Sequence, residues 1–270
     1  MSNAQINDVE FDQIRRFFAA ESGIRLNDSK RSLVCGRLGG RLRKLQLASF
    51  RDYMMYIQHP SHQVERQLAI DLLTTNETYF FREPRHFEFL AQLAAKDWSA
   101  KPLRVWSAAC SSGEEPYSIA MVLSEHLHAN QWQLVASDLS SRMLTSAKQA
   151  LYPLQRAREL PTALLKKYCL KGVGEFDGYL LVDEQLQQRV HFMQLNLMQP
   201  LPEVGTFDVI FLRNVLIYFD QAGKKQIVSQ LLTRLKVGGY LLVGHSESLH
   251  GVVDGLQLLQ PAVYQKMALS

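Results

Sequence analysis

The first part of the chain repeats its apolar residues with the spacing of α-helices. No segment of residues 8–75 shows the period-two alternation of a half-buried strand. Residues 59–61, His-Pro-Ser, interrupt the pattern as a break between two helices does. We therefore expect a small all-helical N-terminal domain at residues 1–75. The helical spacing is carried by Val9, Ile14, Phe17 and Phe18 and by residues 52–57 and 64–73.

From Leu103 the pattern changes to short apolar runs that alternate with helical segments. Strands that alternate with helices form a parallel sheet with helices on both faces. The sequence therefore predicts an α/β domain of the Rossmann-like type, and residues 256–267 offer an additional antiparallel strand. The expected strands are residues 103–109, 133–138, 190–197, 207–212 and 240–244, and the expected helices are residues 116–126, 140–150 and 221–235.

Two segments do not fit this alternation. Residues 152–189 contain a basic helix-like piece, two Gly-containing turns and one short strand, which predicts an inserted small antiparallel β-subdomain at about 155–189. Residues 74–84 join polar side chains to three aromatic residues and a proline, unlike a plain flexible linker. We interpret residues 76–90 as a linker that contributes to the active site and residues 91–270 as the sheet domain.

Charge and cysteine content narrow the classes of protein. The net charge is +4, but residues 25–51 alone carry +7, which indicates an acidic partner near the N-terminus, either nucleic acid or an acidic protein surface. The three cysteines are far apart, with no C-x-x-C pair and no Cys/His cluster, so neither a disulfide framework nor a metal site is predicted. The N-terminus lacks the features of a signal peptide, and the most apolar stretch, residues 207–219, is too short to span a bilayer. We expect a cytoplasmic protein.

The loop after the first expected strand carries the first candidate chemistry. Its sequence ends in Gly113-Glu114-Glu115 and lacks the G-x-G-x-x-G pattern that admits a pyrophosphate. Two acids at a helix start repel a diphosphate and attract a cation. S-adenosylmethionine carries a sulfonium and an ammonium group and no phosphate, so it suits this loop better than NAD or ATP. The alternative is that both glutamates only cap a surface helix.

Polar residues also follow two later strands. Asp138 ends the second strand, where an acid can accept hydrogen bonds from ribose hydroxyl groups. Arg213 and Asn214 follow an apolar run, and a buried arginine requires a partner. A structural ion pair is the alternative to a ligand contact for Arg213. Ligands of open parallel sheets bind at the carboxyl ends of strands, so these residues are candidates for one site.

Five motifs follow one another along the chain. They are T-N-E-T-Y-F-F-R-E at 75–83, R-V-W-S-A-A-C-S-S-G-E-E-P-Y-S at 104–118, A-S-D at 136–138, F-L-R-N-V-L-I-Y-F at 211–219 and G-H-S-E at 244–247. In this order they resemble the chemotaxis receptor methyltransferase (CheR) family over nearly the whole chain. The resemblance implies an S-adenosylmethionine-dependent enzyme that methylates glutamate side chains of chemotaxis receptors and releases S-adenosylhomocysteine.

The resemblance also assigns site residues. Arg82 would orient the substrate carboxylate with its planar fork, and Tyr218 would donate a hydrogen bond nearby, unless Tyr218 is only a core aromatic with its hydroxyl at the rim. The linker, the sheet and the later strand ends would together form the cofactor pocket. Its expected residues are Asn76, Thr78, Arg82, Glu115, Asp138, Asn196, Leu197, Arg213 and Asn214.

Two docking surfaces for the receptor follow from the same resemblance. On a helical wheel Arg37, Arg41 and Lys44 share a basic stripe that suits an acidic helical bundle, although the stripe could equally be a solvated helix face. Three glycines between residues 36 and 40 put the straightness of that helix in doubt. Gly172 and Gly174 in the insertion resemble the part of the family's β-subdomain that takes a receptor's C-terminal pentapeptide tether by adding a strand.

Two other functions remain open from the sequence. A methyltransferase acting on nucleic acid or a small molecule is one, although the segment from Arg213 to Tyr218 lacks the Asn/Asp-Pro-Pro-aromatic motif of adenine methylases. The other is a non-catalytic regulator that binds only cofactor or receptor. Arg82, Glu115 and Asp138 favour the enzyme.

Overall fold

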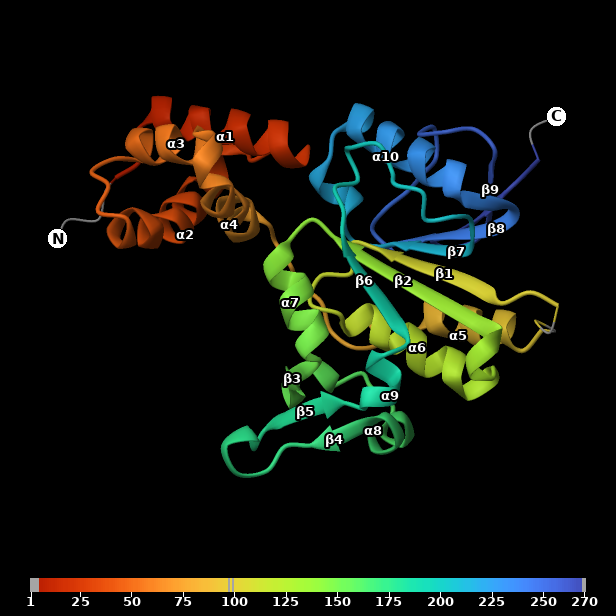
Figure 1. The fold of residues 1–270 in the computed structure, drawn as a ribbon. Coiled ribbons are helices and arrows are strands. Elements are labelled where there is room, and N and C mark those ends of the chain that lie inside the picture. Colours follow the sequence, from red (N-terminus) through yellow and green to blue (C-terminus); the bar gives the residue numbers. More distant parts are fainter. Residues whose placement is uncertain (1–4, 97, 99, 269–270) are drawn as a thin grey trace.

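The computed structural model describes residues 5–96, 98 and 100–268, and it divides into a helical part, a large sheet and a small sheet (Figure 1). The ends of the expected domains at residues 1–4 and 269–270 lie outside the described residues. The all-helical N-terminal part is confirmed, and its helices pack around one apolar core that includes Phe11, Leu38 and Phe50. The helices are α1 Asp8–Ser22, α2 Arg31–Lys44, α3 Phe50–Gln58 and α4 Gln63–Leu73, with short 3₁₀ turns at Asp28–Lys30 and Pro60–His62.

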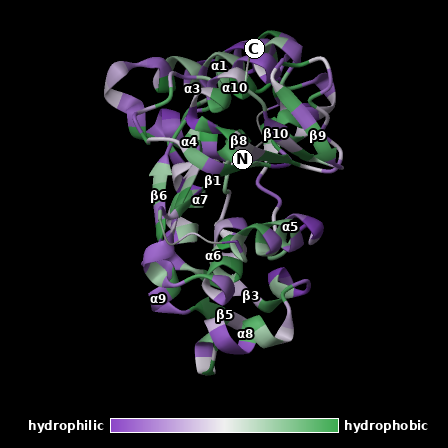
Figure 2. Cartoon of the chain, turned by 90° about the vertical axis from the view of Figure 1, so that its right-hand side faces the viewer, coloured by the Kyte–Doolittle hydropathy of each residue, from purple (hydrophilic) through white to green (hydrophobic). Residues whose placement is uncertain are grey.

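Helix α2 is continuous although it contains three glycines. Its buried residues Val34, Leu38 and Leu42 pack into the helical core, and this packing outweighs the low helix propensity of the glycines. The helices show hydrophilic and hydrophobic residues side by side (Figure 2), as expected of helices with one buried face.

The large sheet has the order β6-β2-β1-β7-β8-β10-β9. The first five of these strands are parallel, and the C-terminal segment adds two antiparallel strands, which confirms the expected α/β class. Its strands are β1 Leu103–Ala108, β2 Trp132–Asp138, β6 Val190–Gln194, β7 Phe207–Leu212, β8 Leu235–Val243, β9 Leu256–Gln260 and β10 Val263–Lys266.

Helices cover both faces of this sheet. Strand β1 turns Leu103 and Val105 into one apolar cluster and Trp106 and Ala108 into another, because successive side chains of a strand point to opposite faces. Helices α5 and α6 pack on the first face and α10 on the second (Figure 1). The helices are α5 Arg85–Ala94, α6 Glu114–His126, α7 Ser141–Gln149 and α10 Gln221–Arg234.

The small sheet is antiparallel with the order β3-β5-β4 and lies apart from the large sheet (Figure 1). It begins before residue 155, the start expected from the sequence, because Leu151–Pro153 pairs with β5 as an edge strand. Its elements are β3 Leu151–Pro153, α8 Thr162–Tyr168, β4 Cys169–Lys171, β5 Tyr179–Val182 and the short helix α9 Glu184–Gln187.

Buried Asp71 joins the helical part to the sheet domain. This residue of α4 accepts hydrogen bonds from the Ser141 hydroxyl at 2.8 Å and from the Ser141 and Arg142 backbone N–H groups at 3.1 and 3.3 Å. An acid is favourable there, because the N-terminus of α7 exposes unpaired N–H groups. The helical part is thereby held beside the carboxyl ends of the strands. In the part of the chain that the structure describes, no helix is long and apolar enough to cross a membrane.

Candidate active site

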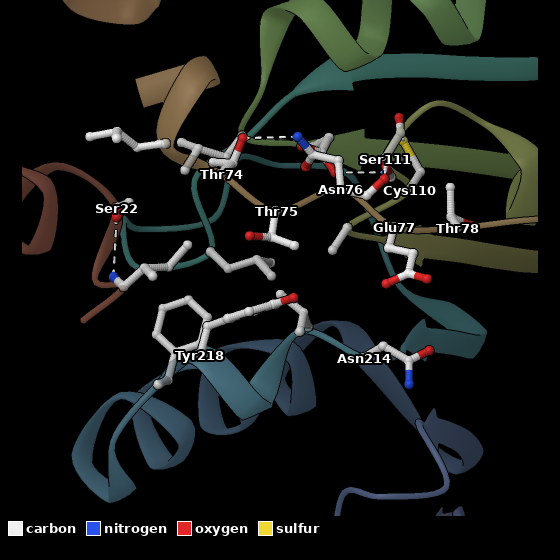
Figure 3. A pocket seen from close by; sticks show the side chains of 18 of the residues that line it. Ser22, Thr74, Thr75, Asn76, Glu77, Thr78, Cys110, Ser111, Asn214 and Tyr218 are labelled. Atoms are coloured by element: carbon white, nitrogen blue, oxygen red, sulfur yellow. Dashed lines mark hydrogen bonds between the residues drawn. The ribbon is translucent and has the colours of Figure 1, made fainter. Parts of the chain in front are cut away.

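A cavity lies at the carboxyl ends of β1, β2 and β7 (Figure 3). Strand β1 has β2 on one side and β7 on the other, so the cavity lies at the point where the strand order reverses, the usual ligand site of such sheets. The structure brings all nine expected cofactor residues, and Tyr218, to this one cavity. They line it as Asn76, Thr78, Arg82, Glu115, Asp138, Asn196, Leu197, Arg213, Asn214 and Tyr218.

Asp138 is held so that its carboxylate can accept further hydrogen bonds. The backbone N–H groups of Ser111 and Ser140 each donate to one of its oxygens, at 2.8 and 2.9 Å. Each oxygen keeps another lone pair, and these suit two neighbouring ribose hydroxyl groups. Burial raises the pKa of Asp138, while the two backbone hydrogen bonds oppose that rise. The arrangement fits the ribose role expected from the sequence.

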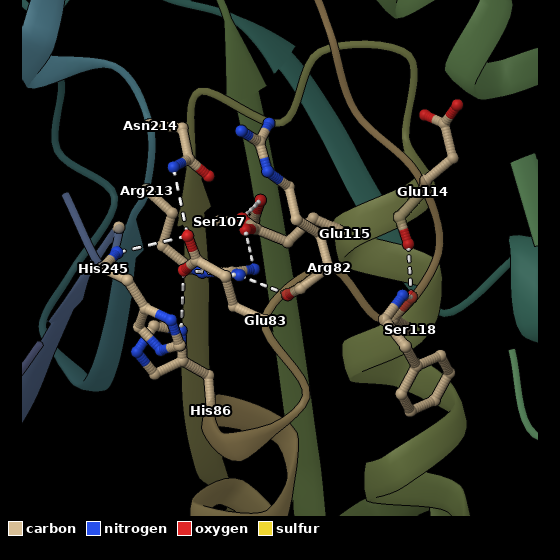
Figure 4. A network of polar contacts seen from close by, with 12 residues as sticks. Arg82, Glu83, His86, Ser107, Glu114, Glu115, Ser118, Arg213, Asn214 and His245 are labelled. Carbon is tan, nitrogen blue, oxygen red and sulfur yellow. Dashed lines mark hydrogen bonds and ion pairs between the residues drawn. The ribbon is translucent and has the colours of Figure 1, made fainter. Parts of the chain in front are cut away.

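Buried Arg213 connects two carboxylates (Figure 4). One guanidinium nitrogen is 2.9 Å from Glu115 and the other is 3.0 Å from Glu83, while the side chain is only 2% exposed. The second nitrogen also donates to the Arg82 carbonyl. The structural ion pair considered for Arg213 therefore exists, and the same side chain also lines the cavity. Although burial raises the pKa of Glu83, Arg213 and the hydrogen bonds around it bring the pKa below its ordinary value.

The two acids at the start of α6 have different surroundings. Glu115 lines the cavity and accepts a hydrogen bond from the Ser107 hydroxyl at 2.7 Å. Glu114 is fully buried and pairs with Arg156 of the inserted segment at 2.7 Å. Burial raises the pKa of Glu114, and the Ser112 hydroxyl and Arg156 oppose the rise. Neither acid is a cap on a surface helix, so that alternative is wrong.

Glu247 fixes the two loops that follow β7 and β8. Its carboxylate accepts hydrogen bonds from the backbone N–H groups of Asn214 at 2.8 Å, Gly244 at 2.7 Å and Ile217 at 3.3 Å. Asn214 is thereby held at φ 56°, a conformation that asparagine tolerates better than most residues. Glycine suits position 244, because a Cβ atom there would lie 2.5 Å from the Asn214 side chain and 2.9 Å from its backbone nitrogen, so a larger residue would force the loop to shift.

Arg82 and Tyr218 face the cavity from different segments. Arg82 lies in the linker and donates to the Glu77 carbonyl at 2.7 Å, and its guanidinium is 5.8 Å from the centre of the Tyr79 ring. Tyr218 ends a 3₁₀ turn, Leu216–Tyr218, shortly after β7. Burial raises the pKa of Tyr218, and nearby Arg82 opposes the rise. The phenol is therefore protonated at neutral pH and can donate a hydrogen bond.

The helical part also lines the cavity, which the sequence gave no reason to expect. Arg25 forms an ion pair with Asp220 at 2.6 Å, and the Asn196 side chain donates to the Glu21 carbonyl at 2.7 Å. One of the two N–H groups of the Asn196 amide is thus used by the protein, and its oxygen accepts a hydrogen bond from the Met198 backbone N–H at 2.9 Å. Residues of the helical part that line the cavity are Ser22, Ile24, Arg25, Leu26, Lys30, Leu33, Leu73, Thr74 and Thr75.

Glu83 and Glu247 also shape the site, but the sequence did not predict them as site residues, although both lie within the motifs that carry the family resemblance. The signal in the sequence is their position alone: Glu83 directly follows Arg82, and Glu247 lies three positions after Gly244. Each carboxylate has a partner far away in the sequence, at a separation of 33 residues for Glu247 and Asn214 and of 130 residues for Glu83 and Arg213. Neither contact has a periodic or local pattern, so only the folded chain reveals it.

The basic stripe of α2 is mostly used inside the protein. Arg37 donates to the Leu72 and Thr74 carbonyl oxygens at 3.0 and 2.8 Å. Arg41 forms a two-pronged ion pair with Glu65 at 2.8 and 2.6 Å. Lys44 is exposed. The two arginines thus hold α2 against α4 and the segment after it, and docking through Arg37, Arg41 and Lys44 stays a prediction.

The two glycines of the insertion shape the turn between β4 and β5. Gly172 lies so close to the Phe176 carbonyl that a Cβ atom would be 1.9 Å from that oxygen. Gly174 has φ 61°, and nothing lies within 4 Å of a Cβ atom placed there. Their positions explain why this turn contains glycine. A role in docking stays a prediction.

Comparison with known proteins agrees with the geometry. The family descriptions that match are "CheR methyltransferase, all-alpha domain" at residues 9–74 and "CheR methyltransferase, SAM binding domain" at residues 76–264. The chain is 42% identical to Chemotaxis protein methyltransferase 2 of Pseudomonas aeruginosa over 88% of this chain and 86% of that protein. It is 38% identical to Chemotaxis protein methyltransferase of Escherichia coli over 96% of this chain and 91% of that protein.

The helical part, the parallel sheet and a cavity lined by Asp138 and Glu115 thus define an S-adenosylmethionine-dependent methyltransferase. The chain belongs to the CheR methyltransferase family.

Proposed function

We propose that this enzyme transfers a methyl group from S-adenosylmethionine to glutamate side chains of chemotaxis receptors, producing glutamate methyl esters and S-adenosylhomocysteine. The observation that carries the proposal is the position of Arg82, which lines the same cavity as Asp138 and Glu115. Only one of its guanidinium N–H groups has a protein partner among the described residues. The others are available to a carboxylate, which guanidinium binds in a two-pronged geometry.

The cavity residues divide between holding the methyl donor and orienting the acceptor. Bound S-adenosylmethionine supplies a methyl group attached to a positively charged sulfur. Asp138 suits its ribose, and Glu115, fixed by Arg213 and Ser107, suits its positively charged end. Leu197 is buried and contributes apolar lining, while Asn76 and Thr78 close the cavity from the linker.

The acceptor needs orientation more than activation. A glutamate side chain is ionised at neutral pH, so no general base has to remove a proton. Arg82 would hold one carboxylate oxygen while the other attacks, and the Tyr218 hydroxyl would donate a hydrogen bond nearby. Alignment of the attacking oxygen with the methyl carbon and sulfur, and exclusion of water, are the main catalytic contributions.

Docking of the receptor is part of the same proposal. The relatives named Chemotaxis protein methyltransferase support a chemotaxis receptor as the acceptor. The exposed Lys44, with support from Arg37 and Arg41 behind it, would meet an acidic helical bundle, and the turn containing Gly172 and Gly174 would meet the receptor's C-terminal tether. We place these steps in the cytoplasm and assign them to the domains at residues 1–75 and 91–270, with the linker at residues 76–90.

Incubation with labelled S-adenosylmethionine and isolated receptor cytoplasmic domains tests the proposal. We expect label in the receptor that mild base releases, because methyl esters hydrolyse readily and methyl amines do not. DNA and RNA serve as parallel acceptors, and a receptor with its methylated glutamates changed to alanine serves as the control. Label in nucleic acid, or cofactor binding with no transfer to any receptor, would overturn it.

A further inference from the structure

A second cluster of ligating side chains lies behind the cavity, and methyl transfer does not use it. Glu83 of the linker, His86 of α5 and His245 of the loop after β8 place one potential ligand atom each within 4.8 Å of one another. Figure 4 shows the two imidazole rings side by side beneath the Glu83 carboxylate. Glu83 and His245 are 162 positions apart in the sequence, so the residues meet only in the fold.

The spacing suits a divalent transition ion. Zinc bonds to nitrogen and oxygen are about 2.0–2.2 Å long, so two ligand atoms of a tetrahedral ion lie about 3.3–3.5 Å apart. The His86 Nδ1 atom is 3.5 Å from the Glu83 Oε2 atom. The His245 side chain is exposed on a loop, and its ring centre is 5.0 Å from that of His86. Because the ligand atoms already lie within 4.8 Å of one another, rotation of the exposed His245 side chain would bring the third ligand to bonding distance.

Independently of this spacing, the surroundings of His86 indicate that the cluster binds a ligand. The His86 side chain is 1% exposed, and neither ring nitrogen has a hydrogen-bond partner among the residues that the structure describes. A buried polar group without a partner is unfavourable, and native proteins rarely keep one without a reason. Its Nδ1 atom faces Glu83, the carboxylate of the same cluster. An ion bonded to one of the two imidazole nitrogens would satisfy that nitrogen.

We propose that Glu83, His86 and His245 form a site for a divalent ion of the Zn²⁺ class, with water at the remaining position. Imidazole and carboxylate together favour Zn²⁺ over Mg²⁺ or Ca²⁺, which prefer oxygen ligands only. The ion would tie the linker and α5 to the loop after β8. The site does not depend on which acceptor is methylated.

Arg213 couples this site to the cofactor cavity. The Glu83 oxygen nearest His86 also accepts a hydrogen bond from Arg213, which holds Glu115 at the cavity wall. A divalent ion competes with the guanidinium for that oxygen and repels it. The ion and S-adenosylmethionine therefore weaken each other's binding, and the coupling must be equal in both directions.

The experiment is a titration of untagged protein with Zn²⁺ by calorimetry and with Co²⁺ by visible absorption. We expect one ion bound per chain and a Co²⁺ spectrum of low coordination number. His245→Ala removes an exposed ligand, so circular dichroism should show an unchanged fold, and Zn²⁺ affinity should fall by at least about tenfold. His86→Gln should lower the affinity similarly.

Two controls make the result decisive. His250→Ala removes an exposed histidine from the same loop, and a His59→Ala/His62→Ala variant removes the surface pair of the helical part. Both should bind Zn²⁺ like the unchanged protein. No binding, or binding lost in a control and kept in His245→Ala, would overturn the site. Zn²⁺ affinity that saturating S-adenosylmethionine leaves unchanged would overturn the coupling.

Discussion

Two arginines of this enzyme form ion pairs with carboxylates, one beside the cofactor cavity and the other inside the helical part. Arg213, under the cofactor cavity, joins Glu83 and Glu115, and Arg41, on helix α2, joins Glu65, which also accepts a hydrogen bond from Tyr53 at 2.9 Å. Their side chains are 2% and 18% exposed. The sequence placed Arg213 in a pocket and Arg41 on a docking surface. The fold shows that both hold internal structure, and that only the acids around Arg213 reach a ligand cavity.

The largest expected difference between the two regions is in stability. Arg213→Ala leaves two carboxylates, Glu83 and Glu115, whose side chains are only 14% and 12% exposed, without their counter-charge, so we expect a loss of about 3–5 kcal/mol in the free energy of unfolding. Arg41→Ala leaves a single carboxylate, 11% exposed, that still accepts a hydrogen bond from Tyr53, so its loss should be smaller. Urea unfolding of both variants measures this. Equal losses in the two variants would show that the deeper burial of Arg213 adds nothing to its contribution to the free energy of unfolding.

Next in size is the effect of Arg82→Lys on turnover. Lysine keeps the charge but not the planar fork, so a misaligned carboxylate should slow methylation on the order of a hundredfold. Single-turnover methylation with saturating cofactor and receptor is the measurement, and separately measured cofactor affinity is the control. An unchanged rate would leave Arg82 only a structural or binding role, like that of Arg213.

Asp138→Ala should weaken S-adenosylmethionine binding by about 1–3 kcal/mol, because it removes a charged acceptor of ribose hydrogen bonds. Calorimetry of the variant gives this value. Asp138→Asn keeps the size of the side chain but places an NH2 group against one of the two backbone N–H donors, so it should lose affinity as well, and the fold of both variants is checked by circular dichroism. If the folded alanine variant binds as tightly as the unchanged enzyme, the cavity is not the cofactor site.

The smallest effect should come from Lys44→Glu. This exposed change leaves the Arg41–Glu65 pair intact, so stability and cofactor affinity should stay the same. Methylation of an acidic receptor should fall several-fold at low salt and recover towards the unchanged rate at high salt, because salt screens surface charge. Lys225→Glu, on the distant helix α10, is the control. A salt-independent loss would argue against docking through α2.

The local pattern of apolar and polar residues predicted most of the helices and strands and several of the cavity residues. The apolar runs located the strands, and polar residues directly after them located Asp138 and Arg213, because the carboxyl ends of parallel strands lie at one edge. The tail was correctly expected to be antiparallel, and α2 formed in spite of its glycines because packing of Val34, Leu38 and Leu42 outweighs propensity.

The contacts between segments that are distant in the sequence could not be predicted from such local patterns. The sequence by itself determined the order of helices and strands, the family resemblance and the residue types at the strand ends. Only the tertiary structure decided that Arg37 and Arg41 face inward, that Arg25 reaches Asp220, and that Glu83, His86 and His245 meet. Periodicity depends on neighbours within one element, whereas the partner of a buried charge is chosen by the packing of whole elements, which leaves no local trace in the sequence.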